Sequence, residues 1–163
     1  MSDGMQKAEH SKRTFLVVVD NSEELGKALL YVCRRAEINQ GDIALLYVMN
    51  PVEFQHWVSV GDLMRAEQKE EAEEAVNAVA KLVKERIGRD PKIIIREGNP
   101  VDEVLQVIDE EPSITALVLG ASANDEGPGP MVSQLTGRLV GKLHVPLIVV
   151  PGSLTEEEIY RIT

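Results

Sequence analysis

The sequence predicts an α/β protein with a parallel sheet and helices on both of its faces. Five short runs rich in Val, Ile and Leu alternate with segments whose apolar residues recur at helical spacing. Runs that are apolar throughout are typical of strands buried on both sides. Strands that alternate with helices form right-handed crossovers, and therefore parallel sheets. With 163 residues, of which 44% are apolar, the chain is long enough to form one such domain without disulfides.

The first strand is expected over residues 15–19, after a mobile polar arm at residues 1–13. The short polar residues 20–22 suit the start of a helix, and an apolar face at helical spacing follows them. Cys33 lies on that face, so we interpret it as a buried and unreactive thiol. Residues 43–48 form the second predicted strand.

The middle of the chain is harder to interpret. Residues 49–61 carry Phe54, His56 and Trp57, and could form a lid, a partner surface or padding over the sheet edge or the next helix. A second helix is predicted over residues 63–87, whose apolar stripe includes Leu82. Its glutamates at 67, 70, 71, 73 and 74 are interpreted as a solvated face, because no histidine lies among them to suggest a metal site.

Two capping patterns define the second half of the chain. Asn99 followed by Pro100 predicts a helix start, with a capping side chain and then proline at the first helical position. Thr155, with Glu158 three residues later, predicts a short helix in the tail over residues 152–163. The remaining predicted elements are strands at residues 92–96, 116–119 and 147–150 and a helix at residues 133–144, with Leu135, Leu139, Val140 and Leu143 buried.

Charge and residue types exclude several functions. With 27 acidic and 17 basic residues and a net charge of −10, the chain is not expected to bind nucleic acid or anionic membranes. It shows no leader-like or membrane-spanning segment, so a cytoplasmic location is expected. Cys33 is the only cysteine, and no cluster has zinc-ligand spacing. No Ser-His-acid set can be argued from His10, His56 and His144, and helix capping is the simplest role for His144.

The connection over residues 120–132 invites a functional explanation because most such connections have only about two to six residues. It ends at a helix N-terminus, where free N–H groups favour an anion. However, it contains no Lys or Arg, and Asp125 and Glu126 add negative charge. It is neither a Walker A loop nor a complete G-x-G-x-x-G, because Val132 occupies the third glycine position. From the residues alone, a weak phosphate site and a surface loop are both open.

Five segments, in a fixed order over residues 14–151, resemble the universal stress protein family. They are Val18-Val19-Asp20-Asn21-Ser22, Leu46-Tyr47-Val48, Gly98-Asn99-Pro100, Leu117-Val118-Leu119-Gly120 and Val145-Pro146-Leu147-Ile148-Val149-Val150-Pro151. The resemblance implies the sheet order 3-2-1-4-5. It also implies a homodimer in which the fifth strand, with Leu147, Ile148, Val149 and Val150, pairs across a two-fold axis.

ATP-binding members of that family carry G-x2-G-x9-G-S/T after the fourth strand. This chain keeps the spacing and Gly120, but Ala123 and Ser133 replace the later glycines and Gln134 replaces the hydroxyl residue. A Cβ atom restricts positive φ and blocks close approach of the backbone to a phosphate. By resemblance, the candidate ligand-binding residues are Asp20, Val48, Gly120, Ser122, Ala123, Gly127, Ser133 and Gln134.

The sequence is therefore compatible with two functions. The first is a dimeric, non-catalytic stress-response module that acts through protein partners and has no firm cofactor. The alternative is an ATP-binding switch or slow ATPase that uses the crevice between the first and fourth strands.

Overall fold

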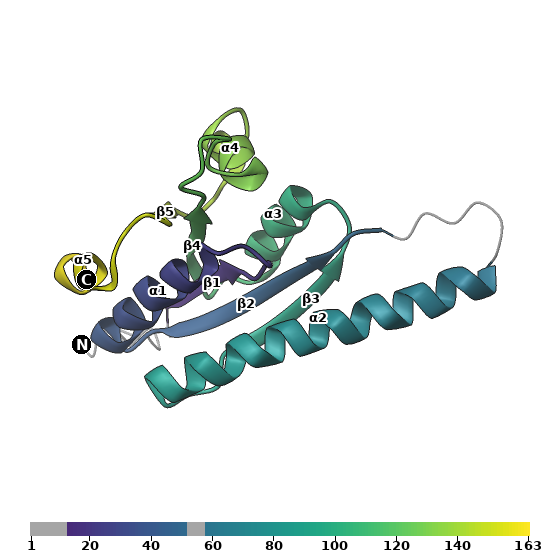
Figure 1. Ribbon diagram of the computed structural model, residues 1–163, viewed down its shortest axis with the longest axis horizontal. Coiled ribbons are helices and arrows are strands. Elements are labelled where there is room, and N and C mark those ends of the chain that lie inside the picture. Colours follow the sequence, from purple (N-terminus) through teal and green to yellow (C-terminus); the bar gives the residue numbers. More distant parts are fainter. Residues whose placement is uncertain (1–12, 52–57) are drawn as a thin grey trace, which may run out of the picture.

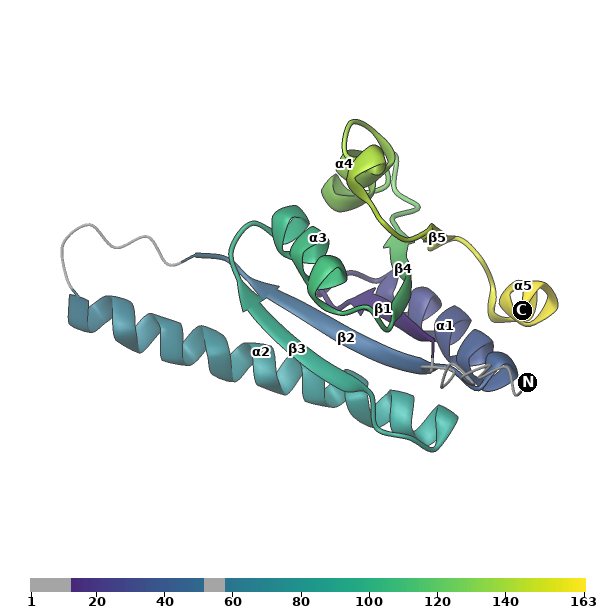
Figure 2. The same ribbon diagram turned by 180° about the vertical axis from the view of Figure 1, so that it is seen from behind.

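A computed structural model describes residues 13–51 and 58–163 of the chain. Five parallel strands form one sheet in the order β3-β2-β1-β4-β5, which confirms the predicted fold class and strand order. Helices α1 and α2 cover one face of the sheet, and α3 and α4 lie on the other (Figures 1 and 2). Most of the predicted arm, as well as Phe54, His56 and Trp57, lies outside the described residues.

The strand bounds agree with the prediction to within two residues at each end. The strands are β1 (Thr14–Val18), β2 (Asp42–Met49), β3 (Lys92–Glu97), β4 (Ile114–Ala121) and β5 (Leu147–Pro151). The helices are α1 (Leu25–Asn39), α2 (Val58–Ile87), α3 (Pro100–Glu110), α4 (Pro130–Thr136) and α5 (Glu156–Ile162), with a 3-10 turn η1 (Val140–Lys142).

The core has two layers because successive side chains of a strand point to opposite faces of the sheet. Val17 and Leu45 face α1 and α2, whereas Leu16 and Leu46 face α3 and α4, and none of the four is accessible to solvent. Cys33 belongs to the first layer and is 2% exposed. Burial raises the pKa of its thiol to about 11, which agrees with the predicted unreactive thiol.

Helix α1 begins later than predicted, at Leu25. One carboxylate oxygen of Asp20 accepts hydrogen bonds from the backbone N–H of Ser22, at 3.0 Å, and from the Ser22 hydroxyl. Glu24 takes the N-cap position, and its side chain makes no capping hydrogen bond. The polar residues after β1 therefore close a turn rather than cap the helix, since Asp readily bonds the backbone two residues on.

Both predicted capping patterns form. The side-chain oxygen of Asn99 accepts from the N–H groups of Val101, at 3.1 Å, and Asp102, at 3.2 Å. The Thr155 hydroxyl accepts from the N–H of Glu158 at 3.1 Å and starts α5. These two short polar side chains fix where α3 and α5 begin.

The fourth predicted helix was wrong in its bounds. Helix α4 already begins at Pro130, and it ends at Thr136 because Gly137 adopts a non-helical backbone (φ −93°, ψ −121°). Val140, expected in the core, is 50% exposed on η1. His144 does not cap a helix, because η1 ends before it. Its Nδ1 lies 2.7 Å from a carboxylate oxygen of Asp109, and both side chains are exposed.

Helix α2 begins five residues before its predicted start and runs along β2 and β3 (Figure 1). All five glutamates of its predicted solvated face are exposed. Leu82 was wrongly placed in the buried stripe, because it is 52% exposed. Within residues 13–51 and 58–163, no helix is both long and apolar enough to cross a membrane.

Candidate functional site

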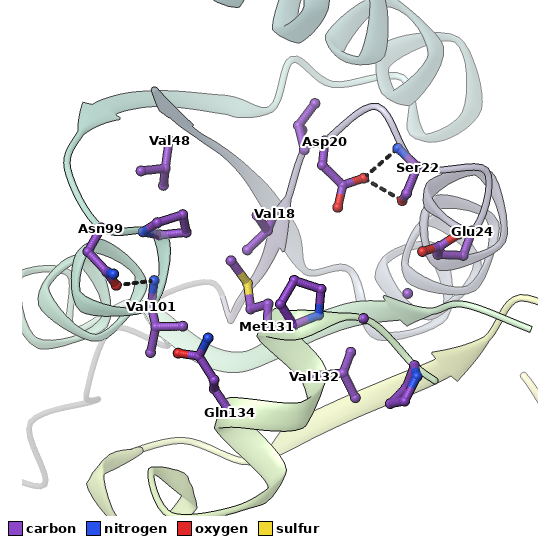
Figure 3. Close-up of a pocket in the computed structure, with 16 residues that line it drawn as sticks. Val18, Asp20, Ser22, Glu24, Val48, Asn99, Val101, Met131, Val132 and Gln134 are labelled. Atoms are coloured by element: carbon purple, nitrogen blue, oxygen red, sulfur yellow. Dashed lines mark hydrogen bonds between the residues drawn. The ribbon is translucent and has the colours of Figure 1, made fainter. Parts of the chain in front are cut away.

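A pocket opens at the carboxyl ends of β1 and β4, where the strand order reverses and ligands of such folds bind (Figure 3). Its volume is about 350 Å³, near the lower end of the range of about 300–1,000 Å³ for ligand sites. The turns that follow β1 and β4 and the first turns of α3 and α4 contribute to its walls. The fold therefore provides a site for a small ligand.

The lining of this pocket is mainly apolar. Figure 3 shows Met131 reaching from α4 toward Val18 at the end of β1. Asn99 holds the wall formed by α3 in place, since it caps that helix. The apolar lining residues are Val18, Val19, Val48, Pro100, Val101, Pro128, Pro130, Met131 and Val132.

The charged groups of the pocket are both carboxylates. One oxygen of Asp20 is bonded to Ser22, and the other points into the pocket (Figure 3). Glu24 adds its carboxylate from the α1 side, and the amide of Gln134 lies beside Val101. Of the residues that the structure describes, no Lys, Arg or His lines the pocket. The site therefore offers acceptors and negative charge.

Gly120 lines the pocket and also lies directly under the N-terminus of α1. A Cβ atom on it would lie 2.8 Å from the carbonyl oxygen of Glu24 and 3.0 Å from the Cγ atom of that residue. The lack of a side chain therefore allows α1 to approach the end of β4 closely. Packing alone is a sufficient reason for glycine at this position.

The loop over residues 122–129 is shorter than the predicted connection because β4 continues to Ala121 and α4 starts at Pro130. Three of its backbone N–H groups bond within the loop. The N–H of Ser122 donates to the carbonyl oxygen of Pro128 at 3.1 Å, and the N–H of Gly127 donates to that of Asn124 at 3.2 Å. The N–H of Asn124 donates to the Ser122 hydroxyl oxygen at 3.2 Å. These three donors are therefore not free to hold a phosphate.

The structure brings together only some of the candidate residues. The pocket lining includes Asp20, Val48, Gly120 and Gln134. Ser122 and Ala123 line an adjacent hollow of about 480 Å³, which shares Ser22 and Glu24 with the pocket. Gly127 and Ser133 line neither hollow. The N–H of Ser133 donates to the carbonyl oxygen of Gly129 as part of the first turn of α4.

Sequence reasoning missed the contribution of α3 and the central place of Met131. Asn99 and Pro100 were recognised as a helix start, but not as part of the pocket. A signal was available, because the carboxyl ends of parallel strands share one edge and the helix after β3 must begin there. Met131 carried no such signal, since its position depends on where α4 begins.

The fold and pocket define a Rossmann-like α/β protein with a crevice at the switch point of its sheet. The sequence model of the universal stress protein family matches residues 12–151, so the chain belongs to this family. No curated protein sequence matches the chain.

Solved structures of other universal stress proteins share the fold. The protein UspA from Lactobacillus plantarum is 22% identical, with a TM-score of 0.68, and the match covers 85% of this chain and 97% of that one. A universal stress protein in complex with cAMP is 18% identical, with a TM-score of 0.58 and coverage of 88% and 99%. One from Archaeoglobus fulgidus in complex with dAMP is 15% identical, with a TM-score of 0.57 and coverage of 85% and 97%.

Proposed function

We propose that this chain is a non-catalytic stress-response module that forms a homodimer and acts through protein partners. The observation that supports the absence of catalysis most directly is the pocket lining, whose charged groups among the described residues are the carboxylates of Asp20 and Glu24, beside a loop that uses three of its own backbone donors. Phosphoryl transfer needs cations and preorganised donors around the transferred phosphate. Among the described residues, no group of three His, Cys, Asp or Glu side chains is arranged to hold a metal ion.

The proposed dimer uses strand β5 (Leu147, Ile148, Val149 and Val150). This strand is at the edge of the sheet and pairs with β4 on one side only. An edge strand presents unpaired N–H and C=O groups that a second copy can pair with across a two-fold axis. Leu147, Ile148 and Val149 are only partly buried, so a partner strand would cover apolar surface as well.

Light scattering coupled to size-exclusion chromatography tests the dimer. The chain mass is 18.0 kDa, so a dimer has 2 × 18.0 = 36.0 kDa. Val149→Lys is expected to shift the mass to that of the monomer, whereas Ile38→Lys, at an exposed position of α1, leaves the dimer intact. A monomeric wild-type protein at about 10 μM, where a stable dimer persists, would contradict this part of the proposal.

A nucleotide-binding switch or slow ATPase is the second candidate. Asp20, Val48 and Gly120 do line the crevice, and two solved relatives are complexes with cAMP and dAMP. Mass spectrometry of material released by denaturing the purified protein tests this function. Nucleotide near one per chain, or turnover of Mg-ATP, would replace the non-catalytic proposal, and its absence together with no calorimetric heat at about 1 mM Mg-ATP would end this alternative.

A further inference from the structure

Helix α5 (Glu156–Ile162) lies beyond residue 151, where the match to the family model ends. We propose that α5 packs against α5 of a second copy, with the two helices antiparallel and with opposite charges facing each other across a two-fold axis. This inference rests on the proposed homodimer and deepens it, because it assigns a contact to that interface in addition to strand β5.

The first argument is the position of α5 in the fold. Helices α2, α1 and α5 form one layer, in which α1 contacts both of the others (Figures 1 and 2). In this layer α2 contacts β2 and β3, whereas α1 also contacts β4 and β5. Helix α5 follows β5 and packs on the side of α1 away from α2, so it lies toward the β5 edge of the sheet.

Pairing of β5 with its copy brings the two α5 helices together. A two-fold axis that continues the sheet through antiparallel β5 strands keeps the α1 layers of both copies on one face. On that face, α5 is the helix of each layer that lies nearest to the axis. The two α5 helices then run antiparallel, because an axis perpendicular to the sheet reverses every element that lies along it.

The second argument is the way in which α1 fixes the orientation of α5. Ile159 is not accessible to solvent, and the guanidinium of Arg34 lies over the ring of Tyr160. The Nε of Arg34 also donates a hydrogen bond to the hydroxyl oxygen of Thr163. Ile159, Tyr160 and Thr163 therefore define the side of α5 that faces α1, and the remaining helix positions are turned away from it.

The opposite side of α5 is complementary to itself. Glu158, Arg161 and Ile162 are three or four residues apart, so they share one side of the helix. Glu158 is partly exposed, and Ile162 is 52% exposed. In the antiparallel pair, Arg161 of each copy faces Glu158 of the other. The same contact therefore forms twice, as pairing across a two-fold axis requires.

The third argument is that Arg161 is available to a second copy. Within residues 13–51 and 58–163 it forms no ion pair, although Glu157 and Glu158 are one helical turn away. Each copy has a net charge of −10, so two copies repel each other as they approach. A cation at the contact offsets part of this repulsion, and coverage of Ile162 removes apolar surface from water.

A mixture of two oppositely charged variants tests the pairing. Arg161→Glu and Glu158→Arg each place like charges opposite each other in their own homodimers, whereas the mixed dimer has opposite charges at both contacts. Native mass spectrometry of an equimolar mixture of the full-length variants should show the mixed dimer above about 80% of all dimers, against about 50% for random pairing. Any loss of helix stability in a variant is shared by its pure and mixed dimers, so it cannot produce this preference.

Sedimentation equilibrium measures the strength of each dimer. Arg161→Glu alone should weaken the homodimer at least about fivefold, because two attractive contacts become repulsive. Lys69→Glu, at an exposed position of α2, changes the net charge by the same amount and should leave the dimer as strong as the wild type. Ile162→Ser should weaken the dimer by about threefold or more, whereas Leu63→Ser, on exposed α2, should not.

The outcomes separate this inference from the proposed dimer. Random pairing in the mixture, or a wild-type dissociation constant for Arg161→Glu, would overturn the α5 contact and leave the β5 dimer standing. A wild-type protein that is monomeric at about 10 μM would refute the proposed dimer, and the α5 contact with it. A preference for the mixed dimer, together with a Val149→Lys protein that still dimerises, would support the α5 contact and refute the β5 pairing.

Discussion

Gly120 and Glu24 pack against each other, although one lies at the end of β4 and the other at the start of α1. A Cβ atom on Gly120 would lie 2.8 Å from the carbonyl oxygen of Glu24. Glu24 is similarly close to Gly152 after β5, because a Cβ atom added to Gly152 would lie 3.0 Å from the Cβ atom of Glu24. The N-terminus of α1 thus rests on two glycines, and this contact has a direct mutational consequence.

Gly120→Ala should lower the free energy of unfolding by about 1–3 kcal/mol, because the new methyl group meets a backbone oxygen that cannot move alone. Urea denaturation of the apoprotein measures the change. Gly26→Ala in α1 is the control, since no atom lies within 4 Å of its new Cβ, and it should raise the stability by about 0.5–1 kcal/mol. Equal stability of Gly120→Ala and the wild type would show that the contact is relaxed in solution.

Asn99→Ala should destabilise the protein by about 1 kcal/mol, because two N–H groups at the start of α3 lose their acceptor. Chemical denaturation and hydrogen exchange at Val101 and Asp102 both report this loss. Asn77→Ala, at an exposed position of α2, should change the stability by less than about 0.5 kcal/mol. If both variants lost the same stability, the cap would not be the cause.

The thiol of Cys33 should make stability fall at alkaline pH. Its pKa is about 11 in the folded chain, against an ordinary value of 9.0, because the thiol is buried. Below the lower value both states keep the proton, whereas between the two values only the unfolded chain releases it, so rising pH favours unfolding. This titration lowers the free energy of unfolding by about 3 kcal/mol at most.

Comparison of the wild type with Cys33→Ala isolates this effect from other groups that titrate in the same range. The difference in unfolding free energy between the two proteins should shrink as the pH rises from about 9 to about 11. Iodoacetamide should label Cys33 slowly in the native protein at neutral pH and rapidly in urea. Fast labelling without denaturant would contradict the buried position.

Arg34 should stabilise the packing of α5 against α1. Its guanidinium carbon lies 4.3 Å from the centre of the Tyr160 ring, and its Nε donates to the Thr163 hydroxyl oxygen at 3.2 Å. A double-mutant cycle of Arg34→Ala and Tyr160→Ala should give a coupling energy of about 0.5–1 kcal/mol. Hydrogen exchange of residues 156–163 should quicken in Arg34→Ala, and a coupling energy near zero would mean that the two side chains act independently.

The fold could be predicted largely because its strands are buried on both faces and read as continuous apolar runs. Asn99 and Thr155 also marked their helix starts correctly, since a cap depends on the residues beside it. The helix start predicted at Asp20 was wrong, because the same side-chain oxygen can either close a turn or cap a helix. The predicted helix was also too long at Gly137. Leu135 and Leu139 keep helical spacing across this residue, so their pattern gives no sign that the backbone leaves the helical conformation there.

The site could be predicted only in outline. Asp20 and Gly120 follow from the rule that ligands lie beyond the carboxyl ends of strands, whereas Val48 was suggested only by the family resemblance, and all three line the pocket. Gly127 was expected near a ligand, yet its φ of +102° shows that a turn within the loop requires it. Ser133 lies inside α4 because that helix begins at Pro130, three residues earlier than its spacing suggested.

Three internal hydrogen bonds, donated by the N–H groups of Ser122, Asn124 and Gly127, hold the loop over residues 122–129 in shape before any ligand arrives. Binding in the crevice would therefore cost little conformational entropy at this wall. The same property opposes a return to phosphate binding. Glycines restored at 123 and 133 would leave the loop's own hydrogen bonds in place, and those bonds would have to break before any phosphate could use their donors.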